Sequence, residues 1–315
     1  MKALQIAAPE DVRLIDVPRP DIIEPDQVLV RMLASSICSQ HEKKIFQNLY
    51  SGAQKCEYPC PPGFPGHEGC GEIETVGSSV HSLNKGDRVL LCGWAGDLHQ
   101  EYIVCPERWA RPTVSSISPV SLAPTELYAC ILAILKRGEK ILRAKCVVIG
   151  LGPAGLAAIQ WLKVLGAYRI TCIEKKKKRL DKAMMLGADA AILSSDAAAI
   201  KTLKEEEPET VIECSGSHDG IKMAFDLAAR EVLLFGYNDL PFEVNQAQWF
   251  EKSLSIKTQF AFDWAVWNET AAHVNRKLID PGRIVSHVFS FTAAEYKKAM
   301  TMLDKQLADK IVMEF

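Results

Sequence analysis

Residues 146–174 read CVVIGLGPAGLAAIQWLKVLGAYRITCIE, and this stretch decides the fold of the chain around it. A short β-branched run at 146–149 ends in the glycine turn GLGPAG at 150–155. Apolar residues then recur with helical spacing from 156 to 165, and a second β-branched run ends at Glu174. This order of strand, glycine turn, helix, strand and acid is typical of a dinucleotide-binding unit.

Each position of the glycine turn has its own physical task. Gly150 permits the tight turn, Gly152 lets the backbone approach a pyrophosphate, and Gly155 lets the helix pack close to the strand. Pro153 and Ala154 open the helix, whose free N–H groups favour the negative pyrophosphate. The alternative is a glycine-rich loop that binds nothing, but the strand, the helix and the acid all stand where a cofactor site needs them.

Glu174 indicates which nicotinamide cofactor is bound. It lies roughly 20 residues beyond the turn, where a carboxylate accepts hydrogen bonds from a ribose 2′-hydroxyl and repels the 2′-phosphate of NADP. The basic run KKKKR at 175–179 follows at once. These cations can hold that phosphate, or they can form a solvated surface. We expect NAD rather than NADP, with Arg179 beside the cofactor.

Length and composition bound the class of protein. A chain of 315 residues is too long for one ordinary core and predicts two domains. No apolar run approaches the roughly 20 residues that span a bilayer, so we expect no membrane partner. The net charge of −2 gives no indication of nucleic acid. Ten cysteines without a secretory signal predict reduced thiols and a cytoplasmic protein.

Two patterns divide the chain. Residues 1 to about 120 are β-rich, with strands expected at 2–7, 12–17, from 28 onward, at 71–76, after the turn that begins at 85, and at 100–104. A helix is expected at 122–136. Strands and helices then alternate, which predicts a parallel, doubly wound sheet. The expected segments are 145–149, 156–165, 169–173, 179–186, 190–193, 197–204, 210–214, 219–229 and 231–235.

The last part of the chain is expected to add to both domains. A strand at 254–258 can extend the parallel sheet. A helix at 265–279, a strand at 285–291 and a helix at 293–303 follow. The final strand, from residue 310, is expected to return to the first domain.

Cys38, His67 and Glu68 are residue types that hold a divalent metal. A thiolate and an imidazole suit zinc, and a catalytic zinc keeps three protein ligands and one open position. From these residue types alone, a structural histidine is the favoured interpretation of His67.

The motifs together resemble those of the zinc-dependent medium-chain alcohol and polyol dehydrogenases, the group of sorbitol dehydrogenase and threonine 3-dehydrogenase. The matching pieces are GHEGCGEIETVG at 66–77, IC at 37–38, KGDRV at 85–89, QEY at 100–102 and the glycine turn. The resemblance implies an α/β fold with a GroES-like β-barrel catalytic domain, residues 1–120 and 283–315. It also implies a Rossmann domain, residues 121–282, and a homodimer or homotetramer formed through the edge strand at 254–258.

The same resemblance implies one catalytic zinc. Cys38 and His67 match the first two ligands, and Glu68 matches a carboxylate that lies near the metal or binds it. Glu126 matches the third ligand at the start of the interdomain helix. Cys130, one helical turn further on, is the alternative. Glu126 can also be a solvated charge in the first turn of a helix.

Two departures from the family pattern bear on catalysis. Gln40 replaces the hydroxyl residue that relays the alcohol proton, and an amide relays protons poorly. Ser39, His41 or water must then take the proton, so Gln40 and His41 are the catalytic candidates. His41 replaces an acid that supports the histidine ligand, although it can be an ordinary polar residue at a helix start. The stretch 91–102 has one cysteine where relatives hold a structural zinc, so we expect one zinc per chain.

The implied reaction is hydride transfer between a secondary alcohol and NAD, with zinc as a Lewis acid. A polyol or cyclitol is the favoured small-molecule substrate, from the Glu126 ligand type and the overall match. One alternative is a zinc-free quinone or enoyl reductase of the same fold. Another alternative is a non-catalytic nucleotide-binding protein. This interpretation stays open because Gln40 replaces the residue that relays the alcohol proton.

Overall fold

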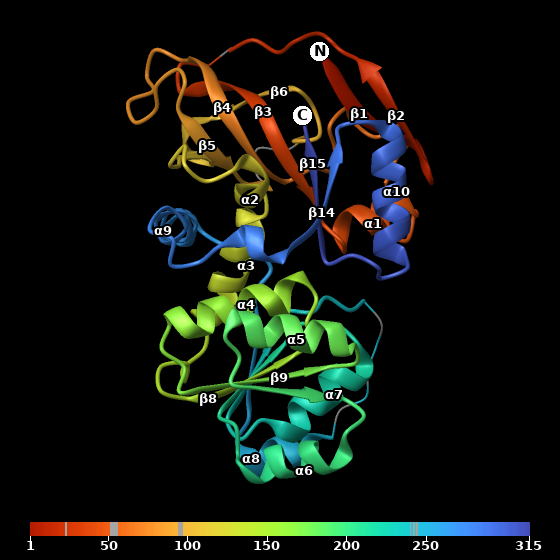
Figure 1. Cartoon of the computed structure of the whole chain (residues 1–315), viewed down its shortest axis with the longest axis vertical. Coiled ribbons are helices and arrows are strands. Elements are labelled where there is room, and N and C mark those ends of the chain that lie inside the picture. The colour runs from red at the N-terminus through yellow and green to blue at the C-terminus, as the bar shows by residue number, and fades with distance from the viewer. Residues whose placement is uncertain (23, 51–55, 94–96, 240, 242, 244) are drawn as a thin grey trace. The chain divides into compact units, whose positions relative to one another are not determined.

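The computed structural model describes residues 1–22, 24–50, 56–93, 97–239, 241, 243 and 245–315 (Figure 1). The chain forms two compact units, Met1–Glu126 with Trp267–Phe315, and Leu127–Val266. The return to the first unit therefore comes at Trp267, earlier than the expected residue 283. The reason lies in helix α9 (Trp264–Asn275), where Asn275 accepts a hydrogen bond from Thr113 at 2.8 Å and donates one to the Pro112 carbonyl at 3.0 Å.

The second unit contains a six-stranded parallel sheet in the order β10-β9-β8-β11-β12-β13. This confirms the expected doubly wound sheet and its extension by the strand near residue 254. The order reverses between β8 and β11, the place where such sheets bind ligands. The strands are β8 (Lys145–Ile149), β9 (Arg169–Glu174), β10 (Ala190–Leu193), β11 (Thr210–Glu213), β12 (Glu231–Leu234) and β13 (Ser255–Thr258).

The helices of this unit follow the expected alternation, with one addition. They are α4 (Pro153–Val164), α5 (Lys177–Leu186), α6 (Ala197–Glu205), α7 (His218–Leu227) and α8 (Gln246–Lys252). Helix α8 was not expected from the sequence, because its residues QAQWFEK show too few apolar positions for a periodic pattern. Asn245 caps its first turn, and Trp249 packs against Phe225 with 5.1 Å between ring centroids.

The first unit is built on a seven-stranded sheet in the order β14-β15-β3-β4-β5-β7, with β6 paired to β3. A separate hairpin pairs β1 with β2. β15 lies antiparallel to β3, which confirms that the end of the chain returns to this unit. The strands are β1 (Lys2–Ala8), β2 (Asp11–Asp16), β3 (Gln27–Ile37), β4 (Glu68–Val76), β5 (Arg88–Leu91), β6 (Tyr102–Pro106), β7 (Ala110–Pro112), β14 (Val285–Ser290) and β15 (Lys310–Glu314). The expected single-cysteine stretch 91–102 falls partly on 94–96, outside the described residues.

The helix expected at 122–136 is interrupted. Helix α2 (Pro119–Leu122) ends just before Pro124, and α3 (Thr125–Leu135) begins just after it. Proline restricts the residue before it and lacks a backbone donor, so the first turn of the expected helix is lost. The remaining helices are α1 (His41–Phe46) and α10 (Ala293–Asp304), with 3₁₀ turns η3 (Glu107–Trp109) and η4 (Pro281–Ile284).

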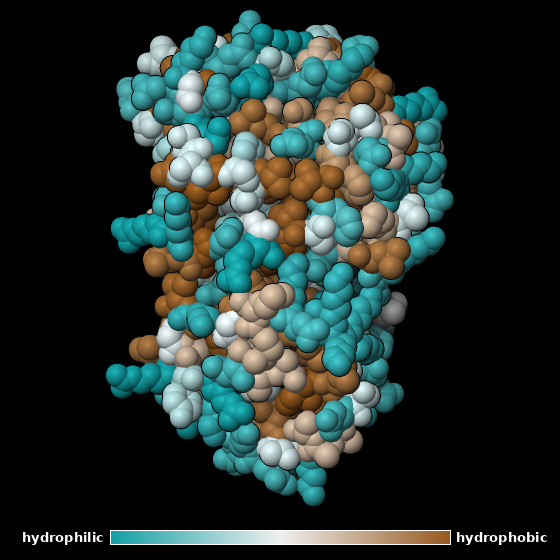
Figure 2. Space-filling model, viewed as in Figure 1, coloured by the Kyte–Doolittle hydropathy of each residue, from teal (hydrophilic) through white to brown (hydrophobic). Residues whose placement is uncertain are grey.

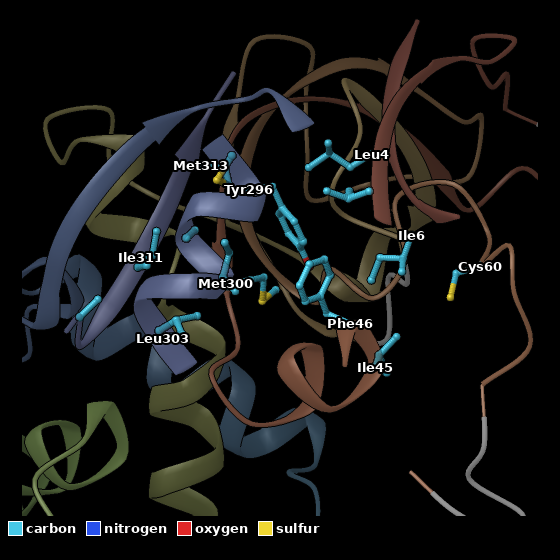
Figure 3. Close-up of a cluster of buried hydrophobic side chains, with 14 residues drawn as sticks. Leu4, Ile6, Ile45, Phe46, Cys60, Tyr296, Met300, Leu303, Ile311 and Met313 are labelled. Atoms are coloured by element: carbon cyan, nitrogen blue, oxygen red, sulfur yellow. The ribbon is translucent and has the colours of Figure 1, made fainter. Parts of the chain in front are cut away.

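A buried cluster of the first unit holds α1 against late parts of the chain (Figure 3). Phe46 of α1 meets Tyr296 of α10 with 6.3 Å between ring centroids. Burying aromatic and aliphatic side chains of this kind is the main favourable term in folding. The labelled members are Leu4, Ile6, Ile45, Phe46, Cys60, Tyr296, Met300, Leu303, Ile311 and Met313.

Hydrophilic side chains are spread over the face shown in Figure 2, with apolar residues among them. Within the described residues, no helix is both long enough and apolar enough to cross a membrane.

Candidate functional site

Strand pairing brings the metal candidates together. β3 and β4 run antiparallel, with Ser36 opposite Glu68. Cys38 follows the end of β3, and His67 immediately precedes β4. Residues that are distant in sequence therefore meet at one end of this strand pair, because the end of one strand lies beside the start of its antiparallel partner.

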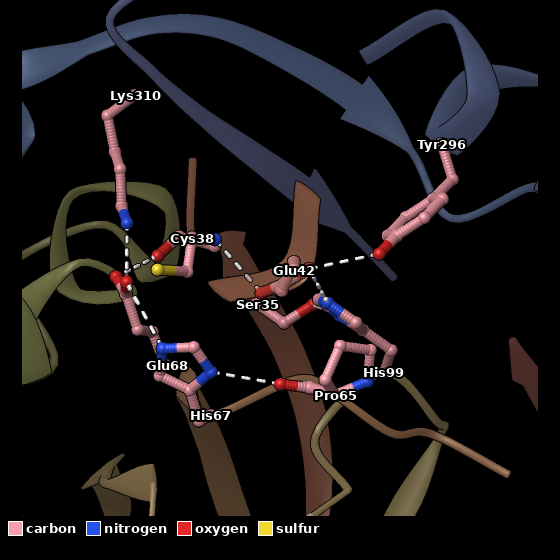
Figure 4. Close-up of polar contacts among 10 residues, drawn as sticks. Ser35, Cys38, Glu42, Pro65, His67, Glu68, His99, Tyr296 and Lys310 are labelled. Atoms are coloured by element: carbon pink, nitrogen blue, oxygen red, sulfur yellow. Dashed lines mark hydrogen bonds and ion pairs between the residues drawn. The ribbon is translucent and has the colours of Figure 1, made fainter. Parts of the chain in front are cut away.

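Cys38, His67 and Glu68 form a compact group. Their ligand atoms all lie within 4.8 Å of one another (Figure 4). A thiolate, an imidazole and a carboxylate are the donors that zinc takes in proteins. The donor set of this group therefore fits the implied metal.

The tautomer of His67 also fits a metal ligand. Its Nδ1 lies 2.9 Å from the Pro65 carbonyl, which can only accept, so Nδ1 carries the proton. Nε2 is then the ligand atom, and it lies 3.9 Å from Glu68 Oε1. Metal-binding histidines commonly donate their second N–H to a carbonyl or carboxylate in this way. Here the Pro65 carbonyl provides this support.

The charges around His67 prepare the site for a cation. Burial alone would lower the pKa of His67, but the hydrogen bond and charge of Cys38, together with Glu126 and Glu68, raise it well above its ordinary value. A divalent cation bound among these groups would replace the proton, since metal ligands bind in their deprotonated forms.

Glu68 is held in place by two residues, Lys310 and Ser36, that no sequence motif indicated. Lys310, at the start of β15, donates to Oε1 at 2.5 Å, and Ser36 donates to Oε2 at 2.5 Å. Both charged side chains are buried, at 3% and 2% exposed. Burial would lower the pKa of Lys310, but the charges of Glu68 and Cys38 raise it. In the sequence, the only feature that distinguishes Lys310 is its position as a charged residue at the start of an apolar strand.

Glu126 lies in the first turn of α3 and is buried, which argues against a solvated charge. Its Oε1 is 3.8 Å from the position that a Cβ on Gly93 would occupy, and His67 Cβ is 3.1 Å from the same point. Glu126 therefore approaches the histidine, although it lies outside the 4.8 Å group found among the described residues. Cys130 belongs to the second unit and is half-buried.

The two catalytic candidates lie at the start of α1. Gln40 is exposed and precedes the first helical residue, His41. The Nδ1 of His41 is 2.9 Å from the Tyr50 hydroxyl, and its ring centroid is 5.7 Å from that of His67. Burial and the neighbouring His67 lower the pKa of His41. The ring of His41 therefore packs edge-on against the ring of His67.

The glycine turn of the second unit has the geometry that a pyrophosphate needs. Gly150 has φ +84°, and an added Cβ would lie 2.6 Å from the Ser215 side chain. A Cβ on Gly155 would lie 2.0 Å from the Gly150 carbonyl oxygen. In front of Gly152, the cap of α4, the space is open within 4 Å. Pro153 and Ala154 follow in the first turn of that helix.

Glu174, at the end of β9, faces the glycine turn. Its carboxylate accepts hydrogen bonds from the backbone N–H of Leu151 at 2.7 Å and of Lys175 at 2.8 Å. Arg179 Nη1 lies 3.9 Å from Oε2. These contacts fix the carboxylate beside the turn, where a ribose would lie.

Glu213 is a further residue of the cofactor-binding unit that was not expected from the sequence. It ends β11 and accepts hydrogen bonds from the backbone of Ser215 at 2.7 Å and of Gly216 at 3.1 Å. Burial raises its pKa. Because Ser215 lies against Gly150, Glu213 shapes the turn that faces the glycine turn at the reversal of strand order.

Comparisons with known proteins agree with this geometry. Residues 24–115 match the family model "Alcohol dehydrogenase GroES-like domain", and residues 153–276 match "Zinc-binding dehydrogenase". The starvation-sensing protein RspB of Escherichia coli is 25% identical over 100% of this chain and 99% of its own length. The sorbitol dehydrogenase of Bombyx mori is 24% identical over 96% of this chain and 95% of its own.

The fold has close counterparts among solved structures. The 2R,3R-butanediol dehydrogenase of Bacillus subtilis superimposes with a TM-score of 0.88 at 20% identity, covering 100% of this chain and 99% of that chain. The chain belongs to the zinc-dependent medium-chain dehydrogenases. The expected pairing of a GroES-like domain with a Rossmann domain is thereby confirmed.

Two glycine variants should separate folding from cofactor binding. Gly152→Ala places a methyl group in open space and should change the free energy of unfolding by less than about 1 kcal/mol. It should nevertheless weaken cofactor binding about 10-fold or more, because the methyl group would occupy the place expected for the pyrophosphate. Gly155→Ala should destabilise the fold by about 1–3 kcal/mol through its clash with Gly150. Urea unfolding and cofactor titration measure the two effects, and equal destabilisation by both variants would contradict this assignment.

Removing the Lys310 charge should destabilise the first unit. Lys310→Met leaves Glu68 as an unpaired buried charge, which should cost about 3–5 kcal/mol of unfolding free energy. Lys310→Arg keeps the charge and is the matched control. Urea denaturation of both variants tests this prediction, and equal stability of the Met and Arg variants would refute it.

Proposed function

We propose that the protein is a zinc- and NAD-dependent dehydrogenase that oxidises a secondary alcohol of the polyol or cyclitol class. The observation that carries the proposal is the Cys38, His67 and Glu68 group, in which the Pro65 carbonyl fixes the tautomer of His67. The zinc-free reductase alternative leaves this arrangement of metal-binding donors without a role.

Cys38, His67 Nε2 and Glu126 would hold the ion, with Glu68 as the adjacent carboxylate. Zinc, when bound, supplies a Lewis acid that polarises the alcohol oxygen. Glu68 adds negative charge, while Lys310 and Ser36 keep its two oxygens in place. The chain thus provides the thiolate and imidazole for the ion and restrains the neighbouring carboxylate.

The cofactor would lie on the glycine turn of the second unit, with Glu174 on the ribose. The backbone N–H of Leu151 holds the Glu174 carboxylate beside the turn. A carboxylate at this place supports NAD over NADP, because it would repel a 2′-phosphate. When bound, the cofactor would supply the acceptor for the hydride of the alcohol carbon, so that the products would be a ketone, the reduced cofactor and the proton released from the hydroxyl.

The alcohol proton needs an acceptor other than Gln40, because an amide has no labile proton near neutral pH. We assign this role to His41. Its ring packs against His67, and its Nδ1 is hydrogen-bonded to the Tyr50 hydroxyl. An imidazole with a lowered pKa is neutral near pH 7 and can accept a proton.

The substrate class and the assembly rest on separate support. The Bombyx mori relative is named a sorbitol dehydrogenase and the Bacillus subtilis structure a butanediol dehydrogenase, and both names denote substrates with more than one hydroxyl group. For assembly, β13 ends the described sheet, and its outer edge is suited to pairing with a second copy in a homodimer or homotetramer. None of the ten cysteines, all of which are among the described residues, is in a disulfide, and this supports a reducing, cytoplasmic location.

Metal content tests the proposal directly. Purified wild-type protein should contain about one zinc per chain, and Cys38→Ala should lose it, because structural and catalytic zinc depend on each thiolate ligand. Cys56→Ala is the control, a partly buried loop thiol that should leave zinc unchanged. Glu126→Gln and Cys130→Ala test which residue is the third ligand. We expect the zinc to be lost in Glu126→Gln and kept in Cys130→Ala. A metal-free wild-type protein, purified without chelators, would exclude the proposed mechanism.

Cofactor choice should depend on Glu174. Glu174→Ala should lower the ratio of kcat/KM for NAD over NADP about 10-fold or more, because the ribose partner and the repulsive charge are both lost. Lys178→Ala, in the exposed basic run, should leave the ratio unchanged. Steady-state kinetics with both cofactors measure the ratio, and a wild-type preference for NADP would contradict the assignment.

A further inference from the structure

A second polar cluster lies behind Cys38, on the side away from its thiol (Figure 4). Its centre is the Glu42 carboxylate, which accepts three hydrogen bonds. The Cys38 backbone N–H donates to Oε1 at 2.9 Å. His99 Nε2 and the Tyr296 hydroxyl donate to Oε2 at 2.9 Å and 3.0 Å.

The cluster is completely enclosed by protein. Glu42 is 0% exposed, and His99 and Tyr296 are each 1% exposed. A carboxylate this deeply buried is costly unless its oxygens are hydrogen-bonded. Here the cost is offset by donors from three separate parts of the chain, so the position of the carboxylate is strongly determined.

The orientation of His99 is determined as well. Its Nδ1 lies 2.9 Å from the hydroxyl of Ser35 on β3. Its ring packs edge-on against Tyr296, with 5.5 Å between centroids. The imidazole is therefore fixed at both nitrogens, and it presents Nε2 to Glu42.

Cys38 needs such a restraint, because it lies outside regular structure. The ladder between β15 and β3 ends where Ile311 pairs with Ile37, and α1 begins only at His41. The hydrogen bond to Glu42 reaches back from α1 to the backbone of this connecting segment. It holds the peptide of Cys38 without occupying the sulfur.

We propose that Glu42 is a positioning residue for the metal ligand Cys38, and that His99 and Tyr296 orient Glu42 for this task. The inference rests on the metal site of the proposed function. Restraint of the Cys38 backbone keeps Sγ directed at the ion and lowers the conformational cost of binding it. Neighbours that orient metal ligands in this way typically change metal affinity when they are mutated.

The decisive experiment compares Glu42→Gln with wild type. Glutamine keeps the size of the side chain, but its amide N–H₂ group cannot accept hydrogen bonds, so the three donors cannot all be satisfied. We expect zinc affinity, measured by competition with a chelator, to fall about 10- to 100-fold. With cobalt(II) in place of zinc, the thiolate-to-cobalt absorption band should shift or weaken, because it reports the geometry of the Cys38 sulfur. Tyr296→Phe, which removes one donor, should show a smaller loss.

A matched control separates positioning from general stability. Glu231 is a buried carboxylate of the second unit that accepts backbone hydrogen bonds from Glu139 and Lys140. Glu231→Gln should lower the unfolding midpoint, as Glu42→Gln does, but leave zinc affinity and the cobalt band unchanged. If Glu42→Gln does not fold, His99→Gln and Tyr296→Phe carry the same test, with several-fold weaker zinc binding expected.

The outcomes distinguish this inference from the proposed function. Tight zinc and cobalt binding by wild type, with unchanged affinity and an unchanged cobalt band in the Glu42 variant or its two substitutes, would overturn the positioning role alone. A wild-type chain that binds neither ion would overturn the metal site and this inference together.

Discussion

The ion pair between Lys310 and Glu68 is the constraint on which the candidate site depends. It joins the first residue of β15 to the first residue of β4, and Ser36 of β3 binds the other oxygen of the same carboxylate. Three strands therefore meet at one buried charge. Without the lysine, Glu68 would be an uncompensated negative charge beside Cys38 and His67. The pair allows a carboxylate to stand permanently next to the proposed ion.

Cys38 is thus flanked by two buried carboxylates with different tasks. Glu68 lies on the side of the thiol and adds negative charge to the group that would hold the ion. Glu42 lies on the side of the backbone and bonds to the peptide N–H. Each is held by donors from late parts of the chain, Lys310 and Tyr296. Electrostatic attraction and geometric restraint are therefore supplied by separate residues, so they can be altered separately.

Much of the fold could be predicted because its signals are local. The glycine turn, the alternating segments and the acid at position 174 lie within one βαβ unit, where spacing alone fixes their relation. Cys38 and His67 could be selected because their residue types and flanking motifs resemble those of a family. Helix α8 could not, because its amphipathic pattern is too short, and Pro124 shortened a helix whose apolar spacing continued past it.

The supporting residues of the site escaped prediction for a different reason. Lys310 and Tyr296 lie 242 and 254 residues from their carboxylate partners, so no spacing in the sequence relates them. A consequence concerns the order in which the protein is made. Cys38, His67 and Glu68 leave the ribosome early, whereas the lysine that neutralises Glu68 follows only after the whole cofactor-binding unit has been synthesised. During synthesis, the first unit must therefore remain incomplete until β15 arrives, because β3 lacks this antiparallel neighbour before then.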